Sequence, residues 1–160
     1  METLEKQLET YILESQDSFY RLAFSYVRDA DAAMDVVQNA IVQALTHLHT
    51  LREPAYIRTW FYRILVNEGL QYIRQNKRLF PCDELPEEIM AEEDVAGRLD
   101  LYRAVFRLKP KLRTVIVLRF YEDMALKDIA RVTRTNLSTV KSRLYKALAE
   151  LKLLYDEESV

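Results

Sequence analysis

Apolar residues recur at three- and four-residue intervals near the end of this chain. The set is Val140, Leu144, Leu148 and Leu151. This spacing defines one face of an α-helix. A shorter run with the same period precedes it, at Leu126, Ile129 and Ala130. Residues 133–136 interrupt the pattern, and Asn136 is a good N-cap for the helix that follows. The stretch 124–151 therefore predicts two helices joined by a turn.

The outer face of the second predicted helix is polar and basic. The residues off the apolar stripe are Lys141, Ser142, Arg143, Tyr145 and Lys146. Ala130 on the first helix is small enough for the two helices to cross closely. This combination is typical of a helix-turn-helix, whose second helix enters the major groove of DNA. A plain helical hairpin with a solvated basic face is the alternative. We favour DNA binding because cap, crossing residue, stripe and basic face occur together.

The composition extends the helical reading to the whole chain. Only two glycines and four prolines occur among 160 residues, of which 49% are hydrophobic and 30% charged. Few turn formers and recurring apolar stripes favour an all-α fold over a β fold. No apolar run is long enough to cross a bilayer, and the acidic N-terminus lacks a signal-peptide core. One cysteine, Cys82, cannot form an internal disulfide, which fits a cytoplasmic protein.

Charge is segregated along the chain, although the net charge is only −2. Residues 1–51 carry eight acidic and three basic side chains, and residues 79–100 carry eight and one. By contrast, residues 52–78 carry six basic against two acidic side chains, and residues 101–155 carry thirteen against four. The two basic blocks indicate nucleic-acid contacts that the overall charge conceals.

These patterns divide the chain into two small helical domains. Residues 1–78 are expected to form four helices, with the third starting at Asp29 or Asp31. Residues 79–97 contain two prolines and a dense acidic run, which predicts a linker. Residues 98–160 form the second domain and end in the helix-turn-helix. The fourth helix should bury Ile57, Trp60, Phe61, Ile64 and Ile73; elsewhere Leu45 and Phe120 are expected to point inward.

Enzyme chemistry finds no support in the sequence. His47 and His49 are two residues apart, so on a helix they point to different sides and do not make a metal pair. Cys82 lies in an acidic stretch, which raises the pKa of a thiol and makes it a poor nucleophile. We find no nucleophile–base pair and no phosphate-binding glycine loop. We therefore expect no catalytic residues, no metal, no cofactor and no small-molecule substrate.

Three stretches together resemble a known family. Residues 31–38 (DAAMDVVQ) resemble region 2.2 of bacterial sigma factors, and residues 60–67 (WFYRILVN) with the basic end 74–78 resemble regions 2.3 and 2.4. Residues 108–144 resemble region 4. The order and the intervening linker match the extracytoplasmic-function (group 4) sigma factors of RNA polymerase, and residues 19–27 and 119–123 look most like the sigma-V branch. The resemblance implies a sigma-2 four-helix bundle and a sigma-4 helix-turn-helix domain.

The resemblance implies two DNA-binding surfaces. The first domain should read the −10 element as single-stranded DNA, with a flipped base held by the loop at 50–56. The matching positions are Leu51, Arg52, Tyr56, Arg58, Thr59, Arg63 and Asn67. The second domain should read the −35 duplex with the helix after the turn. The matching positions there are Thr139, Lys141, Ser142, Arg143, Tyr145 and Lys146. Of these, Thr139 and Arg143 are expected on phosphates.

Protein partners are implied as well. Asp31, Asp35, Gln38 and Asn39 match the positions that contact the clamp of core RNA polymerase, although Asn39 replaces a usual acidic residue. An anti-sigma factor, often membrane-anchored in this family, is a further expected partner beside promoter DNA. A stand-alone helix-turn-helix regulator is the alternative, but it would leave the first domain unexplained. A purely protein-binding helical adaptor is a third possibility.

Two further departures from the family pattern concern the backbone. Gly69 lies in the middle of the fourth helix, where it costs about 1 kcal/mol relative to alanine and could mark a bend. Arg134 stands where the helix-turn-helix turn usually has glycine. If that position is left-handed, an arginine there costs about 1 kcal/mol or more. Thr133 and Thr135 replace apolar turn residues, which predicts a more loosely packed turn.

Overall fold

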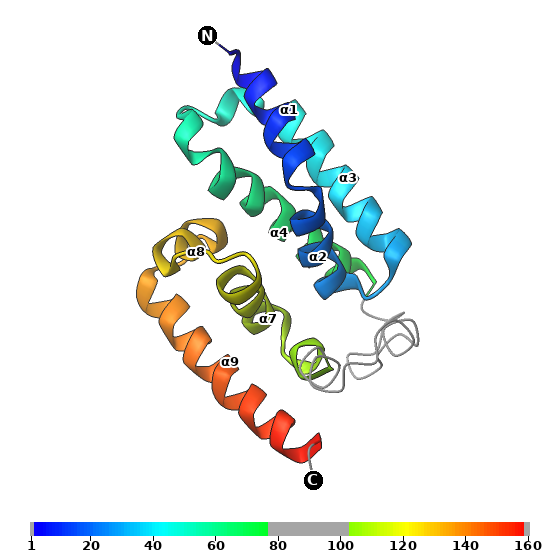
Figure 1. Cartoon of the computed structure of the whole chain (residues 1–160), viewed down its shortest axis with the longest axis vertical. Coiled ribbons are helices and arrows are strands. Elements are labelled where there is room, and N and C mark those ends of the chain that lie inside the picture. Colours follow the sequence, from blue (N-terminus) through cyan, green and yellow to red (C-terminus); the bar gives the residue numbers. More distant parts are fainter. Residues whose placement is uncertain (1, 77–102, 159–160) are drawn as a thin grey trace.

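The computed structural model describes residues 2–76 and 103–158, and the described residues are helical without a strand (Figure 1). The N-terminal part contains α1 (Leu4–Glu14), α2 (Gln16–Val27), α3 (Ala30–Thr46) and α4 (Ile57–Gln75). Two 3₁₀ turns, Leu48–Thr50 and Pro54–Tyr56, connect α3 to α4. The all-α prediction is confirmed. The predicted linker, Cys82 and the basic end at 77–78 lie outside the described residues.

The C-terminal part is a second group of helices. It contains a helical turn at 103–107, α7 (Pro110–Ile116), the π-helical segment η3 (Val117–Tyr121), α8 (Leu126–Thr133) and α9 (Leu137–Glu158). Pro110 occupies the first turn of α7, where its missing N–H would have had no helical partner. Helices α8 and α9 are the predicted pair joined by a turn.

Side-chain caps fix where several helices begin. The Asn136 side chain accepts a hydrogen bond from the Thr139 backbone N–H at 2.7 Å, as predicted for the N-cap of α9. Asp29 caps α3 in the same way, accepting from the Ala32 N–H at 2.8 Å. This resolves the choice between the two aspartates at that helix start. Asp31 instead lies in the first turn, and its side chain is exposed.

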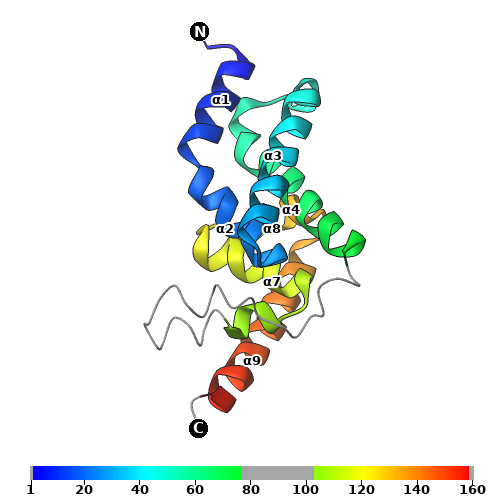
Figure 2. The same ribbon diagram turned by 90° about the vertical axis from the view of Figure 1, so that its right-hand side faces the viewer.

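Helix α4 buries a different face from the one predicted. Its buried residues are Phe61, Tyr62, Leu65, Val66 and Gly69, whereas Ile57, Trp60, Ile64 and Ile73 are only partly buried. The reason is that α4 packs on two sides, against α2 and α3 within the N-terminal part and against α8 in the C-terminal part (Figure 2). The spacing of apolar residues in the sequence predicted one buried face of α4 and did not indicate the contact with α8.

Gly69 lies within the continuous helix α4 and is packed against an aromatic ring of α2. A Cβ at this position would lie 2.7 Å from Cε2 of Tyr26, closer than real Cβ contacts come. The glycine therefore makes room for the Tyr26 ring, which is 4% exposed and belongs to α2. The close approach of α2 and α4 offsets the helix-propensity cost of glycine.

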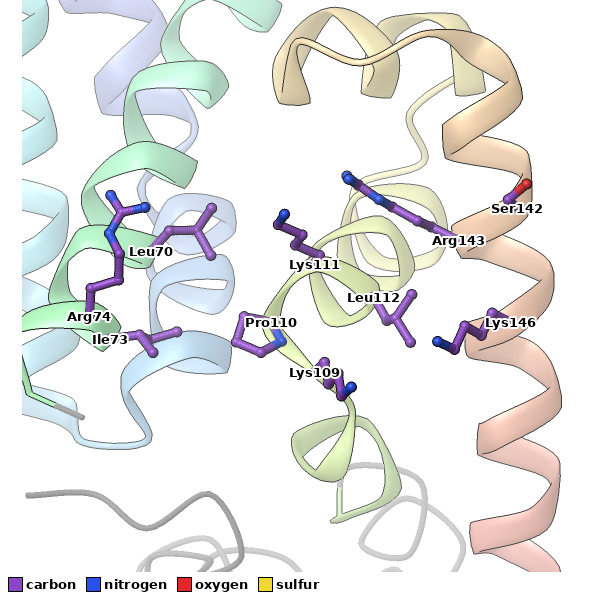
Figure 3. A pocket seen from close by; sticks show the side chains of 10 residues that line it. All are labelled: Leu70, Ile73, Arg74, Lys109, Pro110, Lys111, Leu112, Ser142, Arg143 and Lys146. Carbon is purple, nitrogen blue, oxygen red and sulfur yellow. The ribbon is translucent and has the colours of Figure 1, made fainter. Parts of the chain in front are cut away.

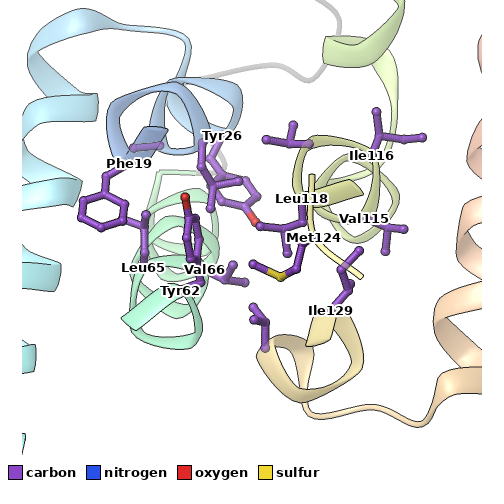
Figure 4. Packing of buried hydrophobic residues seen from close by; sticks show 14 of the residues in the cluster. Phe19, Tyr26, Tyr62, Leu65, Val66, Val115, Ile116, Leu118, Met124 and Ile129 are labelled. Atoms are coloured by element: carbon purple, nitrogen blue, oxygen red, sulfur yellow. The ribbon is translucent and has the colours of Figure 1, made fainter. Parts of the chain in front are cut away.

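The N-terminal and C-terminal parts share one hydrophobic core. Tyr26, Tyr62 and Val66 of the N-terminal part face Leu118, Met124 and Ile129 of the C-terminal part (Figure 4). Hydrogen bonds cross the same boundary. Arg28 donates to the Phe106 carbonyl, Arg113 donates to the Ser25 carbonyl, and the hydroxyls of Tyr26 and Thr114 share a hydrogen bond. These bonds give hydrogen-bond partners to polar groups that are buried where the two parts meet.

Three expected core residues are exposed instead. Phe120 is 58% exposed because the π-helical segment η3 inserts an extra residue into the turn and rotates this ring outward. Leu148 is 39% exposed, and Ala147 takes the buried place beside Leu144 and Leu151. On α3, Ala44 is buried and Leu45 faces outward. In α3 and in α9, the small side chains of Ala44 and Ala147 take the buried positions where helices pack closely.

Candidate nucleic-acid interface

The turn before α9 is built by polar residues. Arg134 caps α8 in the left-handed conformation, with φ 54° and ψ 43°, which is the condition under which an arginine in place of glycine carries an energetic cost. Thr133 Oγ1 bonds to the Ile129 carbonyl at 2.8 Å and to Thr135 Oγ1 at 2.9 Å. The Thr135 N–H bonds to the Ala130 carbonyl. The turn is therefore closed by hydrogen bonds, in which both threonines that replace apolar residues take part.

Helix α9 presents the predicted residues on its outer face. Lys141, Ser142, Tyr145 and Lys146 are exposed, and the Tyr145 ring is 67% exposed. Thr139 and Arg143 are partly buried at the border of that face. The opposite face is anchored by Val140, Leu144, Ala147 and Leu151. We refer to the outer face, Thr139 to Lys146, as the recognition face.

The loop between α3 and α4 separates the residues expected in a base pocket. Leu51 is 6% exposed and packs inward, Arg52 is exposed, and Tyr56 is 48% exposed. Thr59 donates to the Tyr56 carbonyl at 3.2 Å, which fixes the start of α4. Of these residues, Arg52 and Tyr56 have side chains accessible to a nucleic-acid base.

Two of the predicted arginines on α4 contact the C-terminal part. Arg63 donates from Nε and Nη2 to the Arg131 carbonyl at 3.1 and 2.8 Å, near the C-terminal end of α8. Carbonyls in the last turn of a helix have no helical partner and carry the negative end of the dipole. Burial and the nearby charge of Arg134 lower the pKa of Arg63. Arg58 donates to the Glu122 carbonyl.

A groove of about 430 Å³ lies between α3 and α4. We call it the α3–α4 groove; it is lined by Gln43, His47, Thr50, Trp60, Arg63, Ile64, Asn67, Glu68 and Arg134. Trp60 donates from Nε1 to Thr50 Oγ1 at 3.2 Å, so the indole stands at the wall of the groove rather than in the core. Arg63 and Asn67 were predicted site residues. Arg134 enters from the turn before α9.

The polar face of α3 is open. Asp31, Asp35, Gln38 and Asn39 are all exposed, on the side opposite the buried Ala33, Val36 and Ala40. The structure therefore brings these four predicted residues together on one helix face. Met34, 48% exposed, lies among them. Methionine is enriched at protein–protein interfaces, so the exposed Met34 is compatible with a protein contact at this face.

A second cleft, of about 550 Å³, lies between α4, α7 and α9 (Figure 3). We call it the interdomain cleft; its lining is Leu70, Ile73, Arg74, Lys109, Pro110, Lys111, Leu112, Ser142, Arg143 and Lys146. In Figure 3, Arg143 and Lys146 extend from α9 toward α4. The described lining residues include five basic side chains and no acidic one. Part of the recognition face thus faces the N-terminal part.

Comparison with known families identifies the two halves. Residues 12–79 match the model of sigma-70 region 2, and residues 98–151 match that of sigma-70 region 4. The RNA polymerase sigma factor SigV of Bacillus subtilis is 38% identical over 161 residues, covering 99% of this chain and 97% of that protein. The chain belongs to the RNA polymerase sigma factors. It is of the extracytoplasmic-function type and is SigV-like.

Other relatives agree with this assignment. The RNA polymerase sigma-E factor of Streptomyces coelicolor is 32% identical, with 91% of this chain and 84% of that protein covered. The fold matches the sigma factor RpoE in its complex with the anti-sigma factor NepR from Bartonella quintana, with TM-score 0.74, 20% identity, and 94% and 98% of the chains covered. It also matches CnrH in complex with the cytosolic domain of CnrY, with TM-score 0.72, 22% identity, and 94% and 88% covered. Because region 2 is present, the stand-alone regulator is not favoured.

Sequence reasoning missed several residues beside these surfaces. Arg21, Glu122 and Arg131 contact the predicted −10 residues or their neighbours, and Arg134 lines the α3–α4 groove. Their roles depend on how the two parts pack, which no local pattern reports. Of these residues, only Arg134 was singled out by the sequence, because it stands where the helix-turn-helix turn usually has glycine. Among the described residues there is no cluster that could hold a metal, and no helix that could span a membrane.

Proposed function

We propose that this sigma factor directs RNA polymerase to promoters through the two surfaces described above. Residues 1–78 bind the polymerase and the −10 element, residues 98–160 bind the −35 duplex, and residues 79–97 connect them. The observation that carries the proposal is the recognition face of α9, basic, exposed and positioned by the Asn136 cap. Sigma factors are transcription initiation factors rather than enzymes, so no catalytic residue is assigned.

We assign the −35 contacts to Thr139, Lys141, Ser142, Arg143, Tyr145 and Lys146. The −10 contacts are assigned to Arg52, Tyr56, Arg58, Thr59, Arg63 and Asn67, and Leu51, also predicted at this site, is assigned a supporting role. Leu51 is buried, so it supports the loop from beneath while Arg52 and Tyr56 offer the accessible side chains. Tyr56 can stack on an unpaired base, and the arginines can hold the phosphates on either side.

We further propose an anti-sigma factor as a regulatory partner in the cytoplasm. The similar structures of RpoE and CnrH are complexes with NepR and with the cytosolic domain of CnrY. Such a partner would compete with polymerase for sigma. When the anti-sigma factor binds this protein, less free sigma factor is available to bind polymerase, by mass action.

Run-off transcription tests the proposal directly. Purified core polymerase is combined with this protein on a template pool randomised at the −35 and −10 elements. We expect selective transcripts from a subset of templates with a fixed spacing between the elements. Absence of stimulation, together with tight DNA binding by the protein alone, would instead favour a regulator that acts without polymerase.

Asp35→Ala should weaken binding to core polymerase about tenfold or more. Asp35 is exposed on the polar face of α3, so its removal leaves the core intact. Loss of a hydrogen bond to a charged group costs about 1.5–3 kcal/mol, and about 1.4 kcal/mol is a factor of ten in affinity. A pull-down with tagged core polymerase measures the effect. Glu14→Ala, which removes an exposed carboxylate at the end of α1, is the matched control; equal affinity of both variants would remove α3 from the interface.

A further inference from the structure

Residues assigned to the −10 strand already have partners within the chain. Arg63 donates twice to the Arg131 carbonyl, and Arg58 donates to the Glu122 carbonyl. The guanidinium of Arg131 lies 5.1 Å from the centre of the Tyr56 ring, a cation–π distance. The guanidinium donors and the ring face used in these contacts are occupied, so a DNA strand that took them would have to displace α8. The same contacts therefore cannot serve both the C-terminal part and DNA.

The recognition face is partly covered in the same arrangement. Arg143 and Lys146 project into the interdomain cleft, across which Arg74 of α4 stands (Figure 3). A DNA duplex reaching these side chains would occupy the space next to α4. Part of each proposed promoter-binding surface is thus turned toward the other domain.

We propose that this sigma factor occludes part of each of its promoter-binding surfaces in a closed conformation, held by a cluster centred on Glu122. This inference rests on the proposed DNA-binding residues. We define the Glu122 cluster as Arg21, Arg58, Tyr62 and Glu122. It joins α2 and α4 to the residues directly after η3.

The chemistry of the Glu122 cluster suits a latch between domains. The Glu122 side chain is only 3% exposed, and Arg21 Nη1 donates to its Oε1 at 3.1 Å. The Tyr62 hydroxyl donates to Oε2 at 3.1 Å, and burial together with the Glu122 charge raises the pKa of Tyr62. Arg21 also donates to the Tyr121 carbonyl at 3.2 Å. Both carboxylate oxygens thus bind side chains of the N-terminal part, so separating the domains breaks these bonds.

The interdomain cleft supplies an opposing force. Arg74 stands across it from Arg143 and Lys146, and Lys109 and Lys111 add two further positive charges. Like charges facing one another in a cleft repel, and DNA phosphates neutralise such charges when they bind. Opening is therefore favoured by a polyanion and opposed by the Glu122 cluster. A closed state that outnumbers the open one about tenfold weakens apparent DNA affinity about tenfold.

The test uses the full-length chain without polymerase. A short fluorescent single strand carrying the −10 element selected in the transcription experiment is titrated with wild type, Glu122→Gln and Arg21→Ala. Fluorescence anisotropy should show about tenfold tighter binding by both variants, and small-angle X-ray scattering should show a larger radius of gyration. Arg21 is partly exposed, with 41% of its side chain accessible, so Arg21→Ala opens the latch without a core defect. Arg107→Ala, which removes an exposed arginine of the C-terminal part, is the control.

Each outcome bears on the proposal. Unchanged radius and affinity in both variants would show that the Glu122 cluster does not hold the domains. A larger radius without tighter binding would show that the closed state does not block the −10 surface, and the proposal would fall. Circular dichroism confirms that each variant keeps its helix content. Failure of the proposed function appears separately, as absence of transcription from every template, and leaves the scattering result unaffected.

Discussion

Gly69→Val is expected to lower the free energy of unfolding by about 3 kcal/mol. The Cβ alone would meet the Tyr26 ring at 2.7 Å from Cε2, and valine adds two methyl groups. The ring is buried, and its hydroxyl is held by Thr114 of α7, so it has little freedom to move aside. Overpacking of a closed core costs about 1–3 kcal/mol and sometimes more. Urea denaturation followed by circular dichroism measures the loss.

The matched control places the same side chain on the outer face of the same helix. Gln71 is exposed on α4, and Gln71→Val should change stability by less than about 0.5 kcal/mol. The difference between the two variants then reports the contact with Tyr26 rather than the helix propensity of valine. Equal losses would mean that α2 and α4 can separate at this point, and the role assigned to Gly69 would be wrong.

Local rules predicted the parts of the fold that depend on neighbours in sequence. Asn136 caps α9 because an amide side chain can reach the third N–H of the following turn, which any sequence scan can recognise. The left-handed turn at Arg134 was signalled by its position in the motif. The polar side of α3, with Asp35 at its centre, also follows from helical spacing. Each of these features is decided within one or two helical turns.

Contacts between distant segments were beyond such rules. Helix α4 buries Tyr62 and Val66 because the C-terminal part packs on it, so its apolar stripe is wider than one helix face predicts. Phe120 was placed inside because a regular helix was assumed, whereas the π-helical segment turns it outward. The sequence analysis assigned Glu122 no role of its own; only the packing shows that it is buried against Arg21.

The candidate site divides in the same way. Lys141, Ser142, Tyr145 and Lys146 were chosen as the face opposite the apolar stripe, and that face is exposed as expected. Arg58 and Arg63 were chosen by resemblance to the family, and sequence offered no hint that both would be bound to the C-terminal part. Exposure of a helix face is a local property, whereas occupation of an arginine by a distant carbonyl is a property of the whole fold.

Lys146→Ala and Arg143→Ala should affect promoters in different ways. Lys146 is exposed on the recognition face, and an ammonium there can donate to the acceptors of guanine in the major groove. Loss of the Lys146 side chain should make the free energy of DNA binding less favourable by about 1–3 kcal/mol, which is roughly 5- to 150-fold in affinity. The loss should depend on the base pair at one position of the −35 element only. Arg143 is partly buried at the border of the face, and we assign it to a phosphate contact, which positions the helix without reading sequence. Its loss should weaken all promoters alike.

A panel of promoters that differ singly across the −35 element separates the two effects. Run-off transcription by holoenzyme should show a single sensitive position for Lys146→Ala and a flat profile for Arg143→Ala. A phosphate contact also adds about one unit to the slope of log affinity against log salt, so Arg143→Ala should reduce that slope by about one. Lys152→Ala removes an exposed lysine further along α9 and serves as the control. Identical profiles for Lys146→Ala and Arg143→Ala would mean that the recognition face binds phosphates only, and that −35 sequence is read through the shape of the DNA.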